Sequence, residues 1–338
     1  MRIGLIGTGA ISHKHAQAYQ NIGFRVTVCT NRSAESGRRF AARYGAQFVP
    51  AYEEVCRHPD VDIVDVCTYP DFRQPVVRLC AESGKHIQVE KPIATTVKEA
   101  REIIRIAAEG GILLNVISQR RFDDTSIFLA KAIADGRLGR ILECDCYVKW
   151  YRSPQYYARV GKGTWACEGG GALINQAIHQ VDLMRWLAGP VQHVSADWQL
   201  GGVHNIESED VVNAILRFQS GATGVIQAAT AFWPGYTERL EIHGTNGSTI
   251  AASGKLITWD VQHDRGDPAP LGAEGASGAS DPMAVSVVPL ERQFLNFADS
   301  IGNGRKPLVS GEQGLAALQI VEAIYDSCRT GQRIVLEN

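Results

Sequence analysis

Three polar residues have the types and spacing needed for proton transfer on a bound compound. Lys91 follows an apolar run and precedes Pro92, and its ammonium can polarise a carbonyl or an alkoxide. Asn175 and His179 stand at i and i+4 in a stretch of helical period, so they can share one helix face. A histidine exchanges a proton near neutral pH. The pattern suits acid–base chemistry, although an isolated Lys–Pro pair is more often a surface turn and a single helical histidine is more often structural.

The neighbours of His179 define this second group further. Asp182 lies three residues later and can join the same helix face. The glycines at 169–171 precede the helix and permit close approach of a ligand. No second histidine or cysteine stands at ligand spacing on this helix, so we expect no metal site.

A glycine-rich turn follows the first apolar run of the chain. The sequence GTGAIS holds Gly7, Gly9 and Ser12, where a dinucleotide-binding turn has three glycines. Gly7 allows a tight turn, and Gly9 lets a pyrophosphate approach the amides at a helix N-terminus. The third position controls how closely helix and strand pack, which a small serine tolerates. We expect a nucleotide site here, the alternative being a tight turn that binds nothing.

The residues that select the cofactor are expected at the end of the second strand, where an acidic residue usually binds the ribose hydroxyls. Here the chain has Asn31, followed by Arg32 and Ser33. An amide does not repel a 2'-phosphate, and a guanidinium with a hydroxyl can bind one. The pattern favours NADP(H) over NAD(H). If Ser33 only caps the next helix and Arg32 is solvated, the preference stays open.

The elements that position these residues change near residue 122. Before it, strands apolar on both sides alternate with helices, which predicts a doubly wound parallel sheet with Glu90 and Lys91 at its carboxyl edge. After it, a helix at 125–139 leads into alternating runs typical of an open, mainly antiparallel sheet, with a surface loop at 266–282. We expect an α/β protein with domains at 1–121 and 122–338. The expected strands are 2–7, 25–30, 61–68, 86–90 and 112–118, and the expected helices include 33–45 and 95–111.

Composition excludes several classes of partner. The 338 residues include 34 basic and 36 acidic ones, for a net charge of -2, and no basic block occurs. We therefore expect neither nucleic acid nor a membrane as partner. The eight cysteines form no C-x-x-C pair, which indicates free thiols in the cytoplasm.

Taken together, the opening turn, EKPIATT at 90–96, QRRF at 119–122 and GGGALINQAIHQVD at 169–182 resemble the glucose-fructose oxidoreductase, inositol dehydrogenase and rhizopine-catabolism family (Gfo/Idh/MocA). The resemblance implies a Rossmann domain and an α/β domain whose open sheet mediates homodimers or homotetramers. It also implies hydride transfer between a nicotinamide and a sugar, cyclitol or related compound.

The resemblance also assigns roles to individual residues. Lys91 would orient substrate and assist proton transfer, His179 would be the acid–base group, and Asn175 stands where many members have Asp. Arg73 stands where a histidine is frequent. Arg121 and Trp165 are assigned as substrate contacts, with packing as the alternative. The cofactor contacts would be Gly7, Gly9, Ala10, Ile11, Asn31, Arg32, Ser33, Thr68, Pro70, Glu90, Lys91 and Gln119.

Two other functions remain open at this point. An NAD-dependent glycosidase on the same fold would release a sugar with no net change in the cofactor. A non-catalytic nucleotide-sensing regulator would bind the cofactor without turnover, and it would not need the pair Lys91 and His179.

Overall fold

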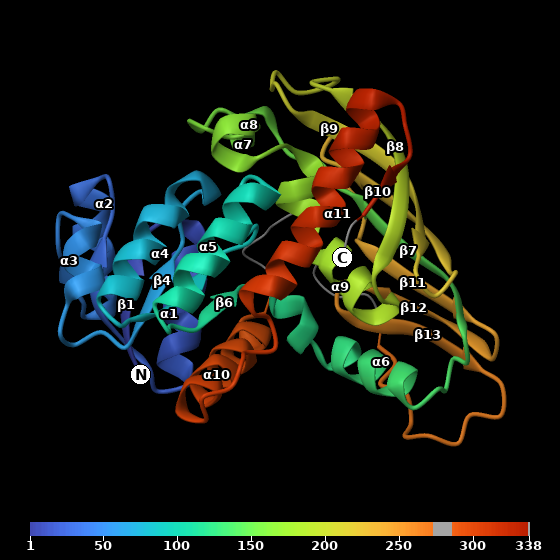
Figure 1. The fold of residues 1–338 in the computed structure, drawn as a ribbon, viewed down its shortest axis with the longest axis horizontal. Helices are drawn as coiled ribbons and strands as arrows, with labels where there is room; N and C mark the ends of the chain where they lie inside the picture. Colours follow the sequence, from blue (N-terminus) through green and yellow to red (C-terminus); the bar gives the residue numbers. More distant parts are fainter. Residues whose placement is uncertain (273–285, 337–338) are drawn as a thin grey trace. The chain divides into compact units, whose positions relative to one another are not determined.

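The computed structural model describes residues 1–272 and 286–336, which form two compact units (Figure 1). The first comprises Met1–Gln119 and Ser286–Leu315, and the second Arg120–Val285 and Ala316–Asn338. The sequence pattern puts residues 286–315 in the second domain, whereas here they pack in the first. Of the loop expected at 266–282, residues 273–282 lie outside the described part of the chain.

Six strands form the sheet of the first unit, in the order β3-β2-β1-β4-β5-β6, and all neighbours run parallel. The central strands β4 and β5 are almost wholly buried, as expected for a parallel sheet covered on both faces. The strand order reverses between β1 and β4, the position where doubly wound sheets bind ligands. The strands are β1 (Arg2–Ile6), β2 (Arg25–Thr30), β3 (Gln47–Phe48), β4 (Ile63–Val66), β5 (His86–Val89) and β6 (Leu114–Val116).

The helices of this unit begin and end at residues that satisfy backbone groups locally. Ser33 caps α2 by accepting a hydrogen bond from the amide of Ser36, and Thr96 caps α5 through the amide of Glu99. Gly45 ends α2 at a φ of 69°. The helices are α1 (Ala10–Asn21), α2 (Ala34–Tyr44), α3 (Tyr52–Arg57), α4 (Arg73–Glu82), α5 (Val97–Glu109) and α10 (Val288–Gly302).

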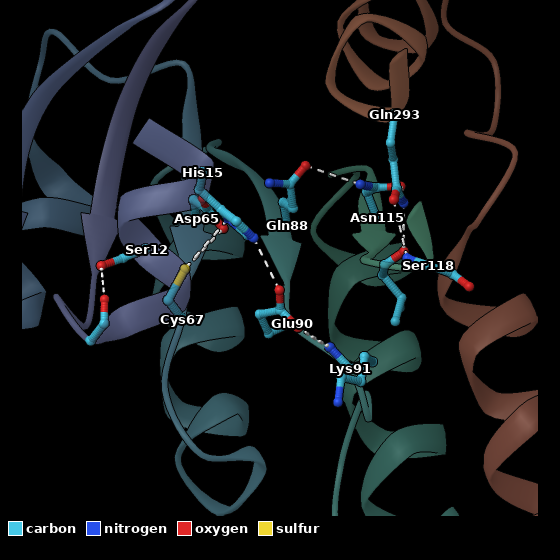
Figure 2. Close-up of polar contacts among 12 residues, drawn as sticks. Ser12, His15, Asp65, Cys67, Gln88, Glu90, Lys91, Asn115, Ser118 and Gln293 are labelled. Carbon is cyan, nitrogen blue, oxygen red and sulfur yellow. Dashed lines mark hydrogen bonds and ion pairs between the residues drawn. The ribbon is translucent and has the colours of Figure 1, made fainter. Parts of the chain in front are cut away.

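A row of buried polar side chains crosses the centre of this sheet (Figure 2). Asp65, Gln88 and Asn115 pair in register on β4, β5 and β6, so their side chains share one face. Gln293 of α10 closes the row, donating to the carbonyl of Val116 at 2.8 Å. Because this buried amide satisfies backbone and side-chain groups of β6, α10 belongs to the first unit.

The second unit contains an eight-stranded sheet in the order β13-β12-β11-β7-β10-β9-β8-β14. Only the pair of β7 and β10 is parallel among these described strands, and the other neighbours are antiparallel. Along β9 buried and exposed positions alternate in its second half, as in a sheet with one solvated face. The strands are β7 (Ile141–Lys149), β8 (Val191–Leu200), β9 (Glu209–Phe218), β10 (Thr223–Ala229), β11 (Arg239–Gly244), β12 (Gly247–Ala252), β13 (Lys255–Val261) and β14 (Ile334–Val335).

Helix α9 packs on β7 and on α6, and a short π-helix, η3, contacts β7, β9 and β10. This η3 segment runs directly into α9, so both lie on the sheet. Helix α11 begins in the first unit and continues in the second. No helix in the described ranges is both long and apolar enough to cross a membrane. These helices are α6 (Asp124–Ala134), α7 (Pro154–Tyr157), α8 (Trp165–Glu168), η3 (Leu173–Ala177), α9 (Ile178–Ala188) and α11 (Gly311–Thr330).

Candidate active site

The glycines of the opening turn differ in what surrounds them. Gly7 has a φ of 93°, and a Cβ there would lie 3.0 Å from the carbonyl oxygen of Cys67. The turn therefore needs glycine at this position for conformation and for space. A Cβ on Gly9 would meet no protein atom within 4 Å. Gly9 thus leaves open space at the N-terminus of α1, where a phosphate group binds in doubly wound sheets.

Ser12 occupies the third glycine position without disturbing the turn. Its side chain is fully buried, and its hydroxyl donates a hydrogen bond of 2.6 Å to the carbonyl oxygen of Gly9 (Figure 2). The hydroxyl is therefore satisfied inside the helix–strand packing.

The residues after β2 surround the edge of the same turn. The side-chain oxygen of Asn31 accepts a long hydrogen bond, 3.5 Å, from the amide of Thr8. Ser33 caps α2, with its hydroxyl oxygen 3.3 Å from the amide of Ser36. Arg32 is exposed. The capping alternative considered for Ser33 is thus present in the structure, while its hydroxyl proton and the guanidinium of Arg32 remain suited to an anionic group.

The residues of the first unit fit a dinucleotide cofactor. The N-cap of α1 is Gly9, with no side-chain cap and no acidic residue in the first turn, so the first amides of the helix are suited to an anion. Ala10 is exposed beside it and Ile11 is half-buried. The side-chain oxygen of Gln119 is buried and has no hydrogen-bond partner in the described part of the chain. An orphaned acceptor of this kind suits a ligand donor.

Glu90 and Lys91 follow β5 at the carboxyl edge of the sheet. Glu90 is buried, and its carboxylate accepts a hydrogen bond of 3.1 Å from the backbone amide of Lys91. Lys91 is half-buried, and the peptide bond to Pro92 is cis.

The segment after β4 brings a buried cation to the same edge. Arg73 is 1% exposed, and its Nη2 donates to the carbonyl oxygen of Thr68 at 3.2 Å. Its Nε and Nη1 atoms have no hydrogen-bond partner among the described residues. Burial lowers the pKa of Arg73 to about 10, and the nearby carboxylate of Glu90 opposes that shift. Pro70, also buried, begins the short helix between Thr68 and α4.

In the second unit, two of the three glycines before η3 are required by packing within the fold. A Cβ on Gly170 would lie 2.3 Å from the hydroxyl of Tyr325, and one on Gly171 would lie 1.9 Å from the carbonyl oxygen of Glu209. The expectation from sequence was that the glycines at 169–171 admit a ligand. In the described structure the Cβ positions of Gly170 and Gly171 are instead occupied by protein atoms.

Glu209 was not found by sequence reasoning, because a lone glutamate on an apolar strand carries no motif. Its carboxylate accepts hydrogen bonds from the amides of Gly171 and Leu173, each at 2.8 Å, and from the hydroxyl of Tyr325 at 2.9 Å. The side chain is fully buried. Burial raises the pKa of Glu209 to about 7, although these three donors oppose the shift. Glu209 thus anchors the start of η3.

Asn175 and His179 are the two half-buried positions in a buried stretch. Every other residue from Glu168 to Met184 is buried. Asn175 lies within η3, and its Nδ2 donates to the carbonyl oxygen of Gly170 at 3.3 Å. Such π-helical turns are frequent at functional sites, because the wider turn displaces side chains from the regular helical faces. The fold therefore leaves these two polar side chains accessible on an otherwise covered segment.

Arg121 and Asp182 form a buried ion pair, with hydrogen bonds of 2.7 Å and 2.5 Å. The guanidinium also lies over the ring of Trp186, 5.3 Å from its centroid. Arg121 is 1% exposed, and Asp182 occupies the Nε and Nη2 atoms of its guanidinium. Asp182 is accordingly turned to Arg121, although the i+3 spacing also allowed a face shared with His179.

Trp165 lies at the start of α8 in an aromatic group with Trp198 and Tyr325. Its backbone amide donates to a carboxylate oxygen of Glu207 at 2.6 Å, and its indole N–H donates to the Glu207 carbonyl at 3.2 Å. The polar atoms of Trp165 are thus used within the unit, while its ring stays half-buried.

The comparisons with known proteins agree with this geometry. Residues 1–118 match the family described as "Oxidoreductase family, NAD-binding Rossmann fold", and residues 128–250 match the "GFO/IDH/MocA C-terminal domain". The chain is 30% identical to the 1,5-anhydro-D-fructose reductase of Ensifer adhaerens, over 99% of this chain and 98% of the relative. It is 28% identical to the myo-inositol 2-dehydrogenase of Thermotoga maritima, over 100% and 99%.

Solved structures share the fold over the same length. The WlbA dehydrogenase from Bordetella pertussis, determined in complex with NADH and UDP-GlcNAcA, superposes with a TM-score of 0.87. Its sequence is 29% identical, and the match covers 100% of this chain and 99% of that one.

Proposed function

The chain belongs to the Gfo/Idh/MocA family of oxidoreductases, and we propose that it transfers a hydride between a nicotinamide cofactor and a hydroxyl or keto carbon of a sugar, cyclitol or sugar derivative. The observation that carries the proposal is the turn after β1, where Gly9 leaves open space at a helix N-terminus without a side-chain cap. A bound nicotinamide nucleotide supplies or accepts the hydride.

Three side chains are assigned to the proton and to the substrate. Lys91, at the carboxyl edge of the first sheet, orients the reacting oxygen and stabilises its negative charge. His179 takes up or returns the proton, because an imidazole titrates near neutral pH. Asn175 binds a substrate hydroxyl. As an amide, Asn175 does not stabilise an imidazolium as the commoner aspartate does. The charged form of His179 must therefore be stabilised by other groups.

For the cofactor we propose NADP(H) in preference to NAD(H). Asn31 carries no charge where an acidic residue would repel a 2'-phosphate, and the exposed Arg32 follows it. The hydroxyl of Ser33 accepts the capping bond with its oxygen and keeps its proton for a phosphate oxygen. Gly7, Ala10, Ile11, Thr68, Pro70, Glu90 and Gln119 are proposed as further cofactor contacts.

One experiment tests the activity against its competitors. Purified protein is titrated with NADPH and with NADH by fluorescence, and the tighter cofactor is then offered with polyols, keto-sugars and aryl glycosides. Stoichiometric change in the absorbance of the reduced nicotinamide is expected with a polyol or a keto-sugar. Release of an aglycone without that change would instead identify a glycosidase. Tight cofactor binding with no turnover on any compound would identify a sensor.

We further propose that the eight-stranded sheet joins copies of the chain into a homodimer or homotetramer. Ile215 is 64% exposed in the middle of β9. Exposed apolar side chains on one face of a sheet mark an association site where they form a contiguous patch. Light scattering on the protein and on Ile215→Asp gives the test, since the charged variant is expected to dissociate.

The compartment proposed for the protein is the cytoplasm. All eight cysteines are free, and five of them are buried. Free thiols persist in a reducing compartment.

A further inference from the structure

The imidazole of His15, in α1, lies between the carboxylates of Asp65 and Glu90. His15 and Asp65 are 0% exposed. The His15 Nδ1 atom lies 2.7 Å from Asp65 Oδ2, and its Nε2 atom lies 3.0 Å from Glu90 Oε1 (Figure 2). An ionised carboxylate only accepts hydrogen bonds, so both contacts are hydrogen bonds when both ring nitrogens carry a proton. The geometry is that of an imidazolium.

Other donors also bind the two carboxylates. The hydroxyl of Tyr19 donates to Asp65 Oδ2 at 2.7 Å, and the amide of Lys91 donates to Glu90 Oε2 at 3.1 Å. Hydrogen bonds to a carboxylate favour its charged state. The shared proton therefore belongs on His15. Burial lowers the pKa of His15, but the contacts with Cys67 and Asp65 raise it well above its usual value. Because burial raises the pKa of the Cys67 thiol to about 12, Asp65 provides the negative charge at neutral pH.

Further charged groups lie near the two carboxylates. Glu90 also lies near the buried guanidinium of Arg73, which in turn lies near Asp71. The ring of Phe294, from α10, covers His15 at 5.3 Å between centroids and adds no charge. Among the described residues, the titratable groups around His15 are Tyr19 of α1, Asp65 of β4, Cys67 and Glu90, and Arg73 of α4 lies near Glu90 and Cys67.

We propose that His15 is a positioning residue for Lys91: its buried positive charge offsets the negative charge of Glu90 and thereby keeps the Lys91 ammonium able to release its proton. Glu90 is held at both oxygens, one by His15 and the other by the amide of Lys91, so it is fixed at the residue that the proposed function makes catalytic. Without the imidazolium, an uncompensated carboxylate on the residue that precedes Lys91 would stabilise the ammonium and suppress proton release.

This inference rests on the proposed role of Lys91, but its test needs neither substrate nor cofactor. Lysines of the full chain are labelled by reductive methylation with carbon-13, and the Lys91 signal is assigned by its loss in Lys91→Arg. Its pKa is then measured by NMR in four further variants. His15→Gln removes a positive charge, and Asp65→Asn removes a negative one. The double variant removes both, and Tyr19→Phe removes a donor to Asp65 without changing charge.

A charge role predicts an alternating pattern. The pKa of Lys91 is expected to rise by about one unit in His15→Gln and to fall in Asp65→Asn, where Glu90 still holds the proton on His15. It should return toward the wild-type value in the double variant and stay unchanged in Tyr19→Phe. A merely structural role would give shifts unrelated to the sign of the charge, and that result, or no shift in the single variants, overturns the proposal. If His15→Gln does not fold, the pKa of Lys91 in Asp65→Asn and in Tyr19→Phe still tests the proposed charge effect.

The outcomes also separate this inference from the proposed function. The alternating pattern without turnover on any sugar would keep the role of His15 and reject the activity. Turnover of a sugar together with an unchanged pKa of Lys91 in the variants would keep the proposed activity and reject the role of His15.

Discussion

The backbone amide of Gly171 donates a hydrogen bond to the Glu209 carboxylate at 2.8 Å, and a Cβ on that glycine would lie 1.9 Å from the Glu209 carbonyl oxygen. Gly9 presents the opposite case, because its Cβ position has no protein atom within 4 Å. The two glycines therefore differ, because protein atoms occupy the Cβ position of Gly171, whereas the Cβ position of Gly9 is open, as the proposed cofactor contact requires.

Alanine substitutions separate these two roles. Gly171→Ala is expected to lower the free energy of unfolding by about 3 kcal/mol, because backbone atoms must move to admit the methyl group. Gly9→Ala is expected to keep the stability within about 0.5 kcal/mol while weakening cofactor binding at least about tenfold. Denaturant unfolding and fluorescence titration measure the two effects. A Gly9→Ala protein that binds cofactor normally would remove the turn from the cofactor site.

Glu209 predicts a pH dependence of stability. Its pKa is raised to about 7 in the folded protein, from an ordinary value of 4.5. Because the folded state holds this proton more tightly than the unfolded one, the stability that Glu209 contributes is full below pH 4.5 and is lost as the pH rises toward 7. The loss amounts to about 3 kcal/mol. Glu209→Gln, which does not titrate, should flatten that part of the profile in urea unfolding at a series of pH values. An identical dependence of the free energy of unfolding on pH in both proteins would contradict this prediction.

Arg121 and Asp182 allow a test of structure against substrate binding. Arg121→Met leaves a buried carboxylate without its ion-pair partner and is expected to cost about 3–5 kcal/mol. The double variant Arg121→Met with Asp182→Leu removes both charges and should recover most of that loss. If instead the single variant is stable and only the KM for the sugar rises, Arg121 contacts substrate directly.

Lys91 is expected to be needed for turnover and dispensable for cofactor binding. Lys91→Met removes the ammonium and should lower kcat by about 10²-fold to 10⁴-fold. Lys98→Met, an exposed lysine in the same region, is the matched control and should behave as wild type. Stopped-flow absorbance with the preferred sugar measures the rate, and a variant with most of its activity would exclude the assigned role.

The proposed preference for NADP(H) over NAD(H) predicts a specific effect at Arg32. Arg32→Ala should raise the Kd for NADPH about tenfold, the loss of one charge-assisted hydrogen bond, and leave that for NADH unchanged. The control is Arg39→Ala, an exposed arginine of α2 that pairs with Glu35. Equal effects on both cofactors, or none, would favour a solvated Arg32 and an open preference.

Much of the first unit was predictable because its signals are local. The expected strand at 25–30 is β2, and the helix expected at 33–45 is α2, since apolar runs and capping residues act within a few positions. The family, the α/β class and the oxidoreductase function also followed from motifs in order along the chain. The turn at Gly7 was readable because only glycine suits its φ of 93°.

Contacts between residues far apart in the chain could not be predicted from the sequence. Nothing local indicates that Gln293 of α10 satisfies β6, or that residues 286–315 pack with the first sheet. His15 and Asp65 are 50 residues apart and carry no motif together. Hydrophobic periodicity reports which face is buried, whereas the partner of a buried polar group depends on strands brought into register. The sequence therefore determined the family, the class of reaction and most local elements, and only the tertiary structure decided which charged groups lie beside Glu90.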